Sequence, residues 1–419
     1  MRGGKLLAGR VGGVAGSLVA GQLLLGLTYV LAARHMEPAG LGLVATCFAI
    51  GTIGATVFDL GMTNYLVREM AAGKVSSRHA RSLVSAKRRI APILLAPTLT
   101  ACLLIMPSPV EGVALGVVGL LVWEAQTANS LLRALEQFSK AASAQVAGRL
   151  LGLLTTVVLV FVTRAELALS LGLGVGFAAE ALIDRLLLGP NRARAARIRE
   201  LGAVQGRSVS FGLVSLSAAG QQLDTPLVTA GAGLTGGGIY AGAGRLLGPL
   251  LFLSSSLAMV GAPWLARAQH DPAALRVEER RISRFALVLA LAPLAAAALG
   301  PLVIPWILGA RYVASGAAFS LLAVGAAFST ISQGTATILQ NRGAERSVGT
   351  AVAVGLVLGL VATFGLAVLG GAVWAAAGYT LSQVYIVVHL TARLRIVRPE
   401  SHGTARAAGA PGRAVVTDP

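Results

Sequence analysis

The feature that most constrains this chain is a recurring run of about 20 apolar residues, the length that one α-helix needs to cross a bilayer. Twelve such runs predict membrane spans near residues 11–33, 40–66, 90–106, 112–132, 141–163, 167–188, 208–232, 239–265, 285–309, 313–340, 347–369 and 373–391. The residue-by-residue alternation of a membrane β-barrel is absent. The sequence therefore predicts an all-α integral membrane protein with about 12 transmembrane helices.

The composition supports this class. Only 12% of the 419 residues are charged, about half the fraction that is usual in soluble domains. A formal net charge of +18 would suggest a nucleic-acid partner if the basic residues lay on a soluble surface. Their placement along the chain argues for a different role.

The basic residues alternate with the predicted spans. Of the 35 lysines and arginines, 30 lie in the N-terminal segment, the C-terminal tail and every second loop. The intervening loops hold Arg34, Arg164 and Arg311, and two arginines lie inside spans. Cytoplasmic loops are enriched in Lys and Arg. We therefore expect a multi-pass protein of the cell (inner or plasma) membrane with both termini in the cytoplasm, no nucleic-acid partner, and contact with anionic membrane lipids.

A predicted cytoplasmic loop near residues 189–207 divides the chain into two halves with the same orientation. We expect an N-terminal six-helix lobe (1–205), a C-terminal six-helix lobe (206–398) and a disordered basic cytoplasmic tail (399–419). Any repeat that relates the halves is parallel, with its axis along the membrane normal. The segments "GLGLVA" and "GGIYAG" are locally similar in the two halves.

Glycine motifs have structural interpretations here. "GAGLTG" (Gly231–Gly236) matches a dinucleotide-binding pattern, but it joins two predicted spans, so a flexible outer turn is the better interpretation. GxxxG motifs occur at Gly12–Gly16, Gly172–Gly176 and Gly355–Gly359 and predict close helix packing. The two cysteines and five histidines show no metal-binding spacing, so we expect no metal site.

Two pairs of oppositely charged residues lie at matched depths inside predicted spans. At a rise of 1.5 Å per residue, Asp224 lies about 12 Å and Arg245 about 9 Å below the outer edge of the membrane. These similar depths predict an ion pair between the two neighbouring spans. Glu124 and Arg149 both fall about 12 Å above the inner edge and predict a second pair.

Two interpretations of these charges stay open. They either lock neighbouring helices together or face a central aqueous cavity, where arginine would hold a phosphorylated substrate through paired hydrogen bonds. Pro226 and Pro249 lack N–H groups and predict kinks beside the charges. The candidate substrate-cavity residues are Arg245, Arg149, Gln22, Gln221 and Gln222. Asp224 and Glu124 are candidates for an ion pair or for ion coupling.

Several segments resemble bacterial polysaccharide-transport flippases, a family of the multidrug/oligosaccharidyl-lipid/polysaccharide exporter superfamily. "LAARHMEPAGLGLVA" and "FDLGMTNYLVRE" resemble the family's opening spans. "QQLDTPLVTAGAGLTGGGIYAGAGRLLGPL" resembles its seventh and eighth spans, and "ILGARYVASGAAFSLLAVG" and "ILQNRGAERSVG" resemble the flanks of its tenth. The first outer loop departs from the family, with His-Met-Glu-Pro where Leu-Gly-Pro-Glu is usual.

The resemblance implies two six-helix lobes around a central cavity that work by alternating access. It also implies transport of a polyprenyl-diphosphate-linked oligosaccharide from the cytoplasmic to the outer leaflet, for cell-surface polysaccharide biosynthesis. The partners would be this substrate, membrane lipids and other polysaccharide-assembly proteins. We expect no cofactor, with H⁺ or Na⁺ as a coupling ion.

Two other functions remain open. One is a multidrug exporter of the same superfamily. The other is a membrane glycan polymerase, ligase or acyltransferase, but such enzymes need catalytic groups on a sizeable outer loop, and the outer loops of this chain are short. We therefore expect a transporter and not an enzyme.

Overall fold

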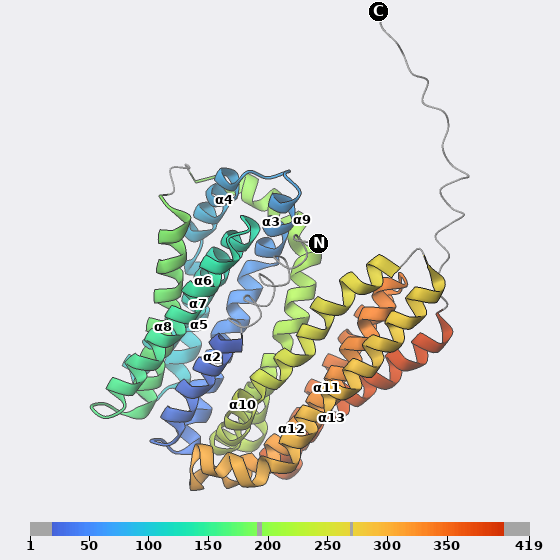
Figure 1. Ribbon diagram of the computed structural model, residues 1–419. Helices are drawn as coiled ribbons and strands as arrows, with labels where there is room; N and C mark the ends of the chain where they lie inside the picture. Colours follow the sequence, from blue (N-terminus) through green and yellow to red (C-terminus); the bar gives the residue numbers. More distant parts are fainter. Residues whose placement is uncertain (1–18, 191–194, 269–270, 398–419) are drawn as a thin grey trace, which may run out of the picture.

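The computed structural model describes residues 19–190, 195–268 and 271–397, and these residues form helices with no β-strand among them (Figure 1). The predicted all-α fold is confirmed. Of the first predicted span, residues 19–33 form a helix, Val19–Ala33. Residues 11–18, the Gly12–Gly16 motif and the tail at 399–419 lie outside the described residues.

The first half of the chain supplies seven further helices. They are α2 (Pro38–Asp59), α3 (Met62–Ala71), α4 (Ser77–Arg89), α5 (Pro92–Ile105), α6 (Pro109–Ala134), α7 (Phe138–Leu159) and α8 (Ala165–Leu188). Proline occupies the first turn of α2, α5 and α6. Its fixed φ angle favours a helix start, and its missing N–H costs nothing there.

The second half begins with α9 (Ile198–Gly220), the short 3₁₀ helix η1 (Gln221–Leu223) and α10 (Asp224–Ala268). It continues with α11 (Pro272–Leu308), η2 (Ala310–Tyr312), α12 (Val313–Asn341) and α13 (Glu345–Ile396). The backbone leaves helical geometry inside α10 at Gly233 (φ 75°) and inside α13 at Gly371 (φ 76°). Glycine adopts such positive φ angles without a steric penalty. The two breaks match the turns predicted between spans seven and eight and between spans eleven and twelve.

Among the described helices, seven are long and apolar enough to cross a membrane, or eight if α4 and α5 form one span bent by 46°. The Val19–Ala33 helix is shorter. The first part of α9 carries Arg199, Glu200 and Arg207, which lower its hydropathy.

Three local predictions were wrong. The second span, expected over 40–66, ends at Asp59, because Leu60 (φ 45°) and Gly61 (φ 73°) take left-handed conformations before α3 begins. The expected loop before residue 90 contains α4, whose start is capped by Ser76. The loop expected at 189–207 is shorter, because α9 begins at Ile198.

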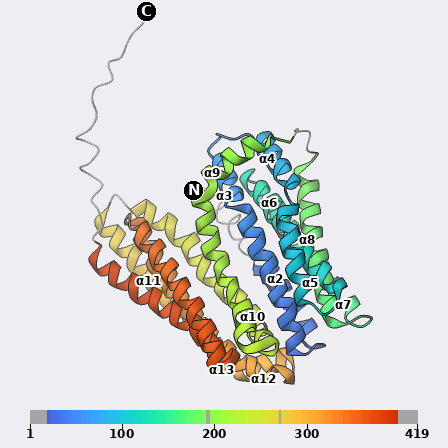
Figure 2. The same ribbon diagram turned by 180° about the vertical axis from the view of Figure 1, so that it is seen from behind.

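The helices form two lobes that lie close together at one end and diverge toward the other, with α9 and α10 between them in both views (Figures 1 and 2). At the closed end α2 packs directly on α10. A Cβ atom on Gly42 would lie 2.8 Å from the backbone nitrogen of Gly238, so the two backbones touch. Close approach of this kind requires glycine at both positions.

Polar contacts also join the lobes at the closed end. Arg34 donates to the carbonyl oxygens of Ile307 and Trp306, both at 2.7 Å, near the C-terminus of α11. Arg311 and Glu37 form a salt bridge of 3.2 Å. These contacts fix the end of the molecule that the basic-residue pattern predicts to be outside.

Helix α9 contacts the first lobe, although it opens the second half of the chain. A Cβ atom on Gly212 would lie 2.8 Å from the carbonyl carbon of Leu60, and Ser208 donates to the Leu60 carbonyl oxygen at 2.9 Å. The predicted lobe boundary between residues 205 and 206 falls inside α9. It remains a prediction.

Close packing at two of the GxxxG motifs is confirmed. A Cβ atom on Gly152 of α7 would lie 2.7 Å from the carbonyl oxygen of Gly172 on α8. Gly355 and Gly359 pack on Ile386 and Ser382, so they hold the two segments of α13 together.

Candidate functional site

The candidate site is built around the interruption between α9 and α10. Helix α9 ends at Gly220, η1 covers three residues, and α10 starts at Asp224. Pro226 has no N–H group for the carbonyl of Gln222, which is consistent with the break in the regular helix at this point. The break places Asp224 in the first turn of α10, where the helix dipole favours a negative charge.

A cavity of about 290 Å³ lies beside this interruption. Its lining comes from α2, η1, both segments of α10, α12 and α13, so both lobes contribute. The lining residues are Ala49, Gln221, Gln222, Asp224, Thr225, Tyr240, Ala241, Gly244, Arg245, Leu247, Leu251, Leu322 and Tyr379. The sequence-predicted residues Gln221, Gln222, Asp224 and Arg245 are therefore brought together.

Asp224 is held by hydrogen bonds. The hydroxyl of Tyr240 donates to Oδ2 at 2.8 Å, and the backbone N–H of Thr225 donates to Oδ1 at 2.7 Å. The break at Gly233 turns the chain back, so Tyr240 meets a carboxylate 16 residues earlier. The predicted ion pair between Asp224 and Arg245 is therefore wrong. The two groups line one cavity, but the tyrosine hydroxyl and not the guanidinium binds the carboxylate.

Arg245 lies against aromatic rings of the first lobe. Its Cζ atom is 4.6 Å from the ring centroid of Tyr29 and 4.8 Å from that of Phe48. Both rings are almost fully buried, at 2% and 3% exposed. Stacking of this kind attracts the cation to the ring faces. None of the described carboxylates forms a salt bridge with Arg245.

Arg149 lies inside the first lobe, outside the lining of this cavity. Its Nη2 is 3.1 Å from Oε2 of Glu180, and its Cζ is 3.8 Å from the ring centroid of Phe177. Its side chain is only 11% exposed. The contacts support a helix-locking role between α7 and α8.

Glu124 is also outside the cavity lining. Its carboxylate accepts from Arg88 at 2.7 and 2.9 Å and lies 2.6 Å from Nη2 of Arg185. The predicted Glu124–Arg149 pair is therefore wrong. Equal depth in the membrane did not bring the two together, because α7 packs against α8, while α6 packs mainly against α8, α2 and α5.

The predicted glutamines differ in their contacts. The Oε1 of Gln222 accepts from the hydroxyl of Thr52 at 2.6 Å, which links η1 to α2. Gln22 lies beside the cavity-lining helix instead of in the lining, with its Oε1 3.7 Å from a Cβ atom placed on Gly248.

Sequence reasoning missed the aromatic members of the site. Tyr240 and Tyr379 line the cavity, and Tyr29 and Phe48 hold Arg245. A signal did exist for Tyr240, because it shares the turn-flanked stretch with Asp224. Among the described residues, no group of three His, Cys, Asp or Glu side chains is placed to hold a metal ion.

The fold is that of known membrane transporters. The lipid II flippase MurJ in an inward closed conformation matches with a TM-score of 0.73 at 12% identity, covering 91% of this chain and 87% of that one. An inward-facing multidrug resistance MATE family transporter of the MOP superfamily matches with a TM-score of 0.70 at 15% identity, covering 91% and 96%. An outward-facing multidrug resistance MATE family transporter of the MOP superfamily matches with a TM-score of 0.57 at 16% identity, covering 94% of this chain and 97% of that one. The TM-score is thus higher with these two inward conformations than with the outward-facing one.

Sequence comparison identifies the family. No curated protein sequence matches this chain. A family model described as "Polysaccharide biosynthesis protein" matches residues 30–317. This match covers the first lobe from residue 30 onward, the interruption at Asp224 and the cavity-lining part of α10. The chain therefore belongs to this polysaccharide biosynthesis protein family, as its sequence resemblance indicated.

Proposed function

We propose that this protein is a flippase that moves a polyprenyl-diphosphate-linked oligosaccharide from the cytoplasmic to the outer leaflet by alternating access. The observation that carries the proposal is the position of Arg245. Its guanidinium lines a cavity between the lobes, is stacked on Tyr29 and Phe48, and is not neutralised by a salt bridge from a described carboxylate. A planar guanidinium is well suited to bind a diphosphate.

An apolar groove beside the cavity suits the lipid part of such a substrate. It has a volume of about 650 Å³ and lies between α2, the α4–α5 bend and α9. Its wall includes Ile53, Val57, Ile93, Leu201 and Leu223. Leu223 belongs to η1, whose other two residues, Gln221 and Gln222, line the cavity. A polar head in the cavity and an isoprenoid chain in the groove would thus lie on either side of η1.

We further propose that Asp224 is the carboxylate that couples transport to an H⁺ or Na⁺ gradient. It lines the cavity, whereas Glu124 is held by two arginines elsewhere. The basic loops support an orientation with both termini in the cytoplasm. In that orientation the lobes diverge toward the cytoplasm, so the cavity would receive substrate from that side.

A multidrug exporter is the second candidate. Asp224 with the rings of Tyr240 and Tyr379 forms an anionic, aromatic wall of the cavity, which suits an organic cation. The fold match to MATE family transporters supports the same alternative.

The deciding experiment uses a strain that lacks this gene and carries Arg245→Ala, Arg245→Lys or the wild-type gene. For a flippase, Arg245→Ala should cause lipid-linked sugar to accumulate in the cytoplasmic leaflet at a normal protein level. Lysine should restore only part of the function, because it cannot form a paired hydrogen bond. Normal outer-leaflet glycan in the strain without the gene, together with ethidium efflux that the wild-type gene restores, would instead establish the exporter.

A further inference from the structure

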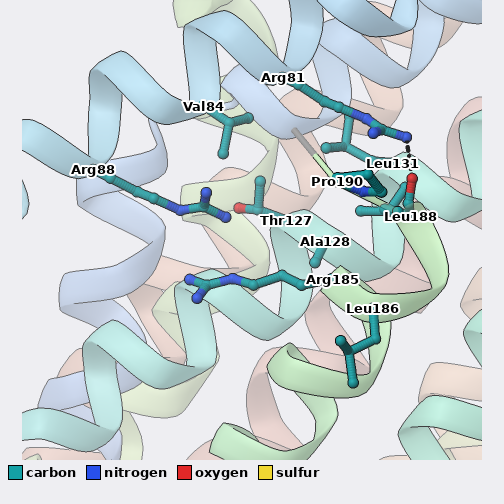
Figure 3. Close-up of a pocket in the computed structure, with 11 residues that line it drawn as sticks. Arg81, Val84, Arg88, Thr127, Ala128, Leu131, Arg185, Leu186, Leu188 and Pro190 are labelled. Carbon is teal, nitrogen blue, oxygen red and sulfur yellow. Dashed lines mark hydrogen bonds between the residues drawn. The ribbon is translucent and has the colours of Figure 1, made fainter. Parts of the chain in front are cut away.

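Another pocket lies on the first lobe, between α4, α6 and α8 (Figure 3), at the end where the lobes diverge (Figure 1). Its volume is about 430 Å³, and it shares no lining residue with the central cavity. The lining residues are Arg81, Val84, Arg88, Thr127, Ala128, Leu131, Arg185, Leu186, Leu188, Gly189 and Pro190. We call it the α4–α8 pocket.

The α4–α8 pocket carries an excess of positive charge. Arg81 and Arg88 extend from α4 and Arg185 extends from α8 (Figure 3). The Glu124 carboxylate forms salt bridges with both Arg88, at 2.7 Å, and Arg185, at 2.6 Å. Three guanidinium groups and one carboxylate leave a local charge of +2. Because the two paired side chains are 34% and 45% exposed, they remain accessible to a second anion.

The guanidinium of Arg81 has an N–H group without a hydrogen-bond acceptor. Its Nη2 donates to the carbonyl oxygen of Leu188 at 2.6 Å, at the last turn of α8 (Figure 3). Its Nε is buried and has no hydrogen-bond partner. An unpartnered buried N–H of a charged group is unfavourable, so an anion near this guanidinium would stabilise it.

Most of the remaining lining of the α4–α8 pocket is apolar. Val84, Leu131, Leu186 and Leu188 line it. Leu186 is 71% exposed, and Leu182, one turn earlier on α8, is 57% exposed. Exposed leucines on a membrane-spanning helix face lipid, so the pocket opens onto the acyl chains beside α8. The cationic groups and the apolar wall together form an amphipathic site.

We propose that the α4–α8 pocket binds an anionic phospholipid of the surrounding bilayer. The phosphate accepts hydrogen bonds from Arg88 and Arg185, whose guanidinium groups meet at Glu124, and an acyl chain lies along Leu182 and Leu186. Arginine forks match phosphate oxygens in geometry and charge. The lipid would hold α4 against α8 within the first lobe. This inference is independent of the transported substrate.

The test measures lipid binding to the purified full-length protein by native mass spectrometry. The probes are dioleoylphosphatidylglycerol, dioleoylphosphatidylcholine and inorganic phosphate. We expect the wild type to prefer phosphatidylglycerol. In the Arg88→Gln/Arg185→Gln variant its dissociation constant should rise by about tenfold or more, because two charge-assisted hydrogen bonds are lost. Arg89→Gln is the matched control, because Arg89 is exposed on the same helix and does not line the pocket.

A second variant separates lipid binding from a purely structural role. Glu124→Gln removes the carboxylate that competes for Arg88 and Arg185, so phosphatidylglycerol should bind several-fold more tightly. This variant also keeps the test decisive if the double variant does not fold. Three results would overturn the proposal: equal binding of phosphatidylglycerol by all variants, equal binding of phosphatidylcholine, or displacement of the lipid by millimolar inorganic phosphate.

Discussion

Gly42 of α2 and Gly238 of α10 touch through their backbones where the two lobes meet. A Cβ atom on Gly238 would lie 3.0 Å from the backbone nitrogen of Gly42, and the reverse distance is 2.8 Å. The two glycines belong to "GLGLVA" and "GGIYAG", the locally similar stretches of the two halves. Contact between corresponding segments is what a pseudo-two-fold axis between the lobes produces.

We therefore expect Gly42→Ala to weaken the closed end. The added methyl group has no room, so α2 and α10 must separate and the lobes should part at that end. Spin labels at Val162 and Val313, both exposed, would report an increased or broadened distance in a variant whose two native cysteines are replaced. Gly174→Ala is the control, because nothing lies within 4 Å of its added methyl group. An unchanged distance distribution in Gly42→Ala would refute this role.

The pair formed by Arg149 and Glu180 should govern stability and not substrate binding. Arg149→Ala leaves the buried carboxylate of Glu180 without its partner, at a cost of about 3–5 kcal/mol. We expect a lower melting temperature in detergent and a lower protein level. Arg149→Met/Glu180→Leu removes both charges and should recover much of the loss. If Arg149→Ala abolished transport while it melted like the wild type, the helix-locking role would be wrong.

Variants of Asp224 and Tyr240 can distinguish a role in coupling transport to an ion gradient from a role in protein stability. Asp224→Asn keeps an acceptor for the tyrosine hydroxyl but cannot change charge, so imposed H⁺ or Na⁺ gradients should no longer accelerate flipping in proteoliposomes. Tyr240→Phe removes one hydrogen bond to the carboxylate, worth about 1.5–3 kcal/mol, and should reduce stability while the gradient response persists. Gradient-stimulated flipping by Asp224→Asn would exclude this residue as the coupling group.

The apolar groove can be blocked without disturbing the backbone. Gly202 of α9 lines the groove, and nothing lies within 4 Å of a Cβ atom added there. In Gly202→Trp the ring should displace about one isoprene unit, which forfeits about 3 kcal/mol of apolar burial. We expect the flipping rate at limiting substrate to fall by roughly tenfold or more.

Gly206→Trp is the matched control for the groove. Gly206 is equally open, lies one turn further along α9 and is not part of the groove wall. If both variants lost the same activity, bulk on α9 would be the cause and the groove would have no role in holding the lipid chain.

Sequence alone determined the features that depend on local properties. Runs of apolar residues predicted the helices, and the glycine-rich stretch 231–236 predicted the turn that occurs at Gly233. Pro226 predicted the interruption that forms η1. The sequence also identified Gln221, Gln222, Asp224 and Arg245 as candidate site residues, because it placed them on two neighbouring spans.

Tertiary structure decided which charges meet. The rise per residue fixes the depth of a side chain in the membrane, but it does not fix its direction around the helix axis or the neighbour that the helix selects. Glycine contacts pair α7 with α8, so Arg149 meets Glu180, while Glu124 faces Arg88 and Arg185. Asp224 and Arg245 reach one cavity but bind a tyrosine and two aromatic rings. Those partners follow from how helices distant in sequence pack side by side, which no local pattern specifies.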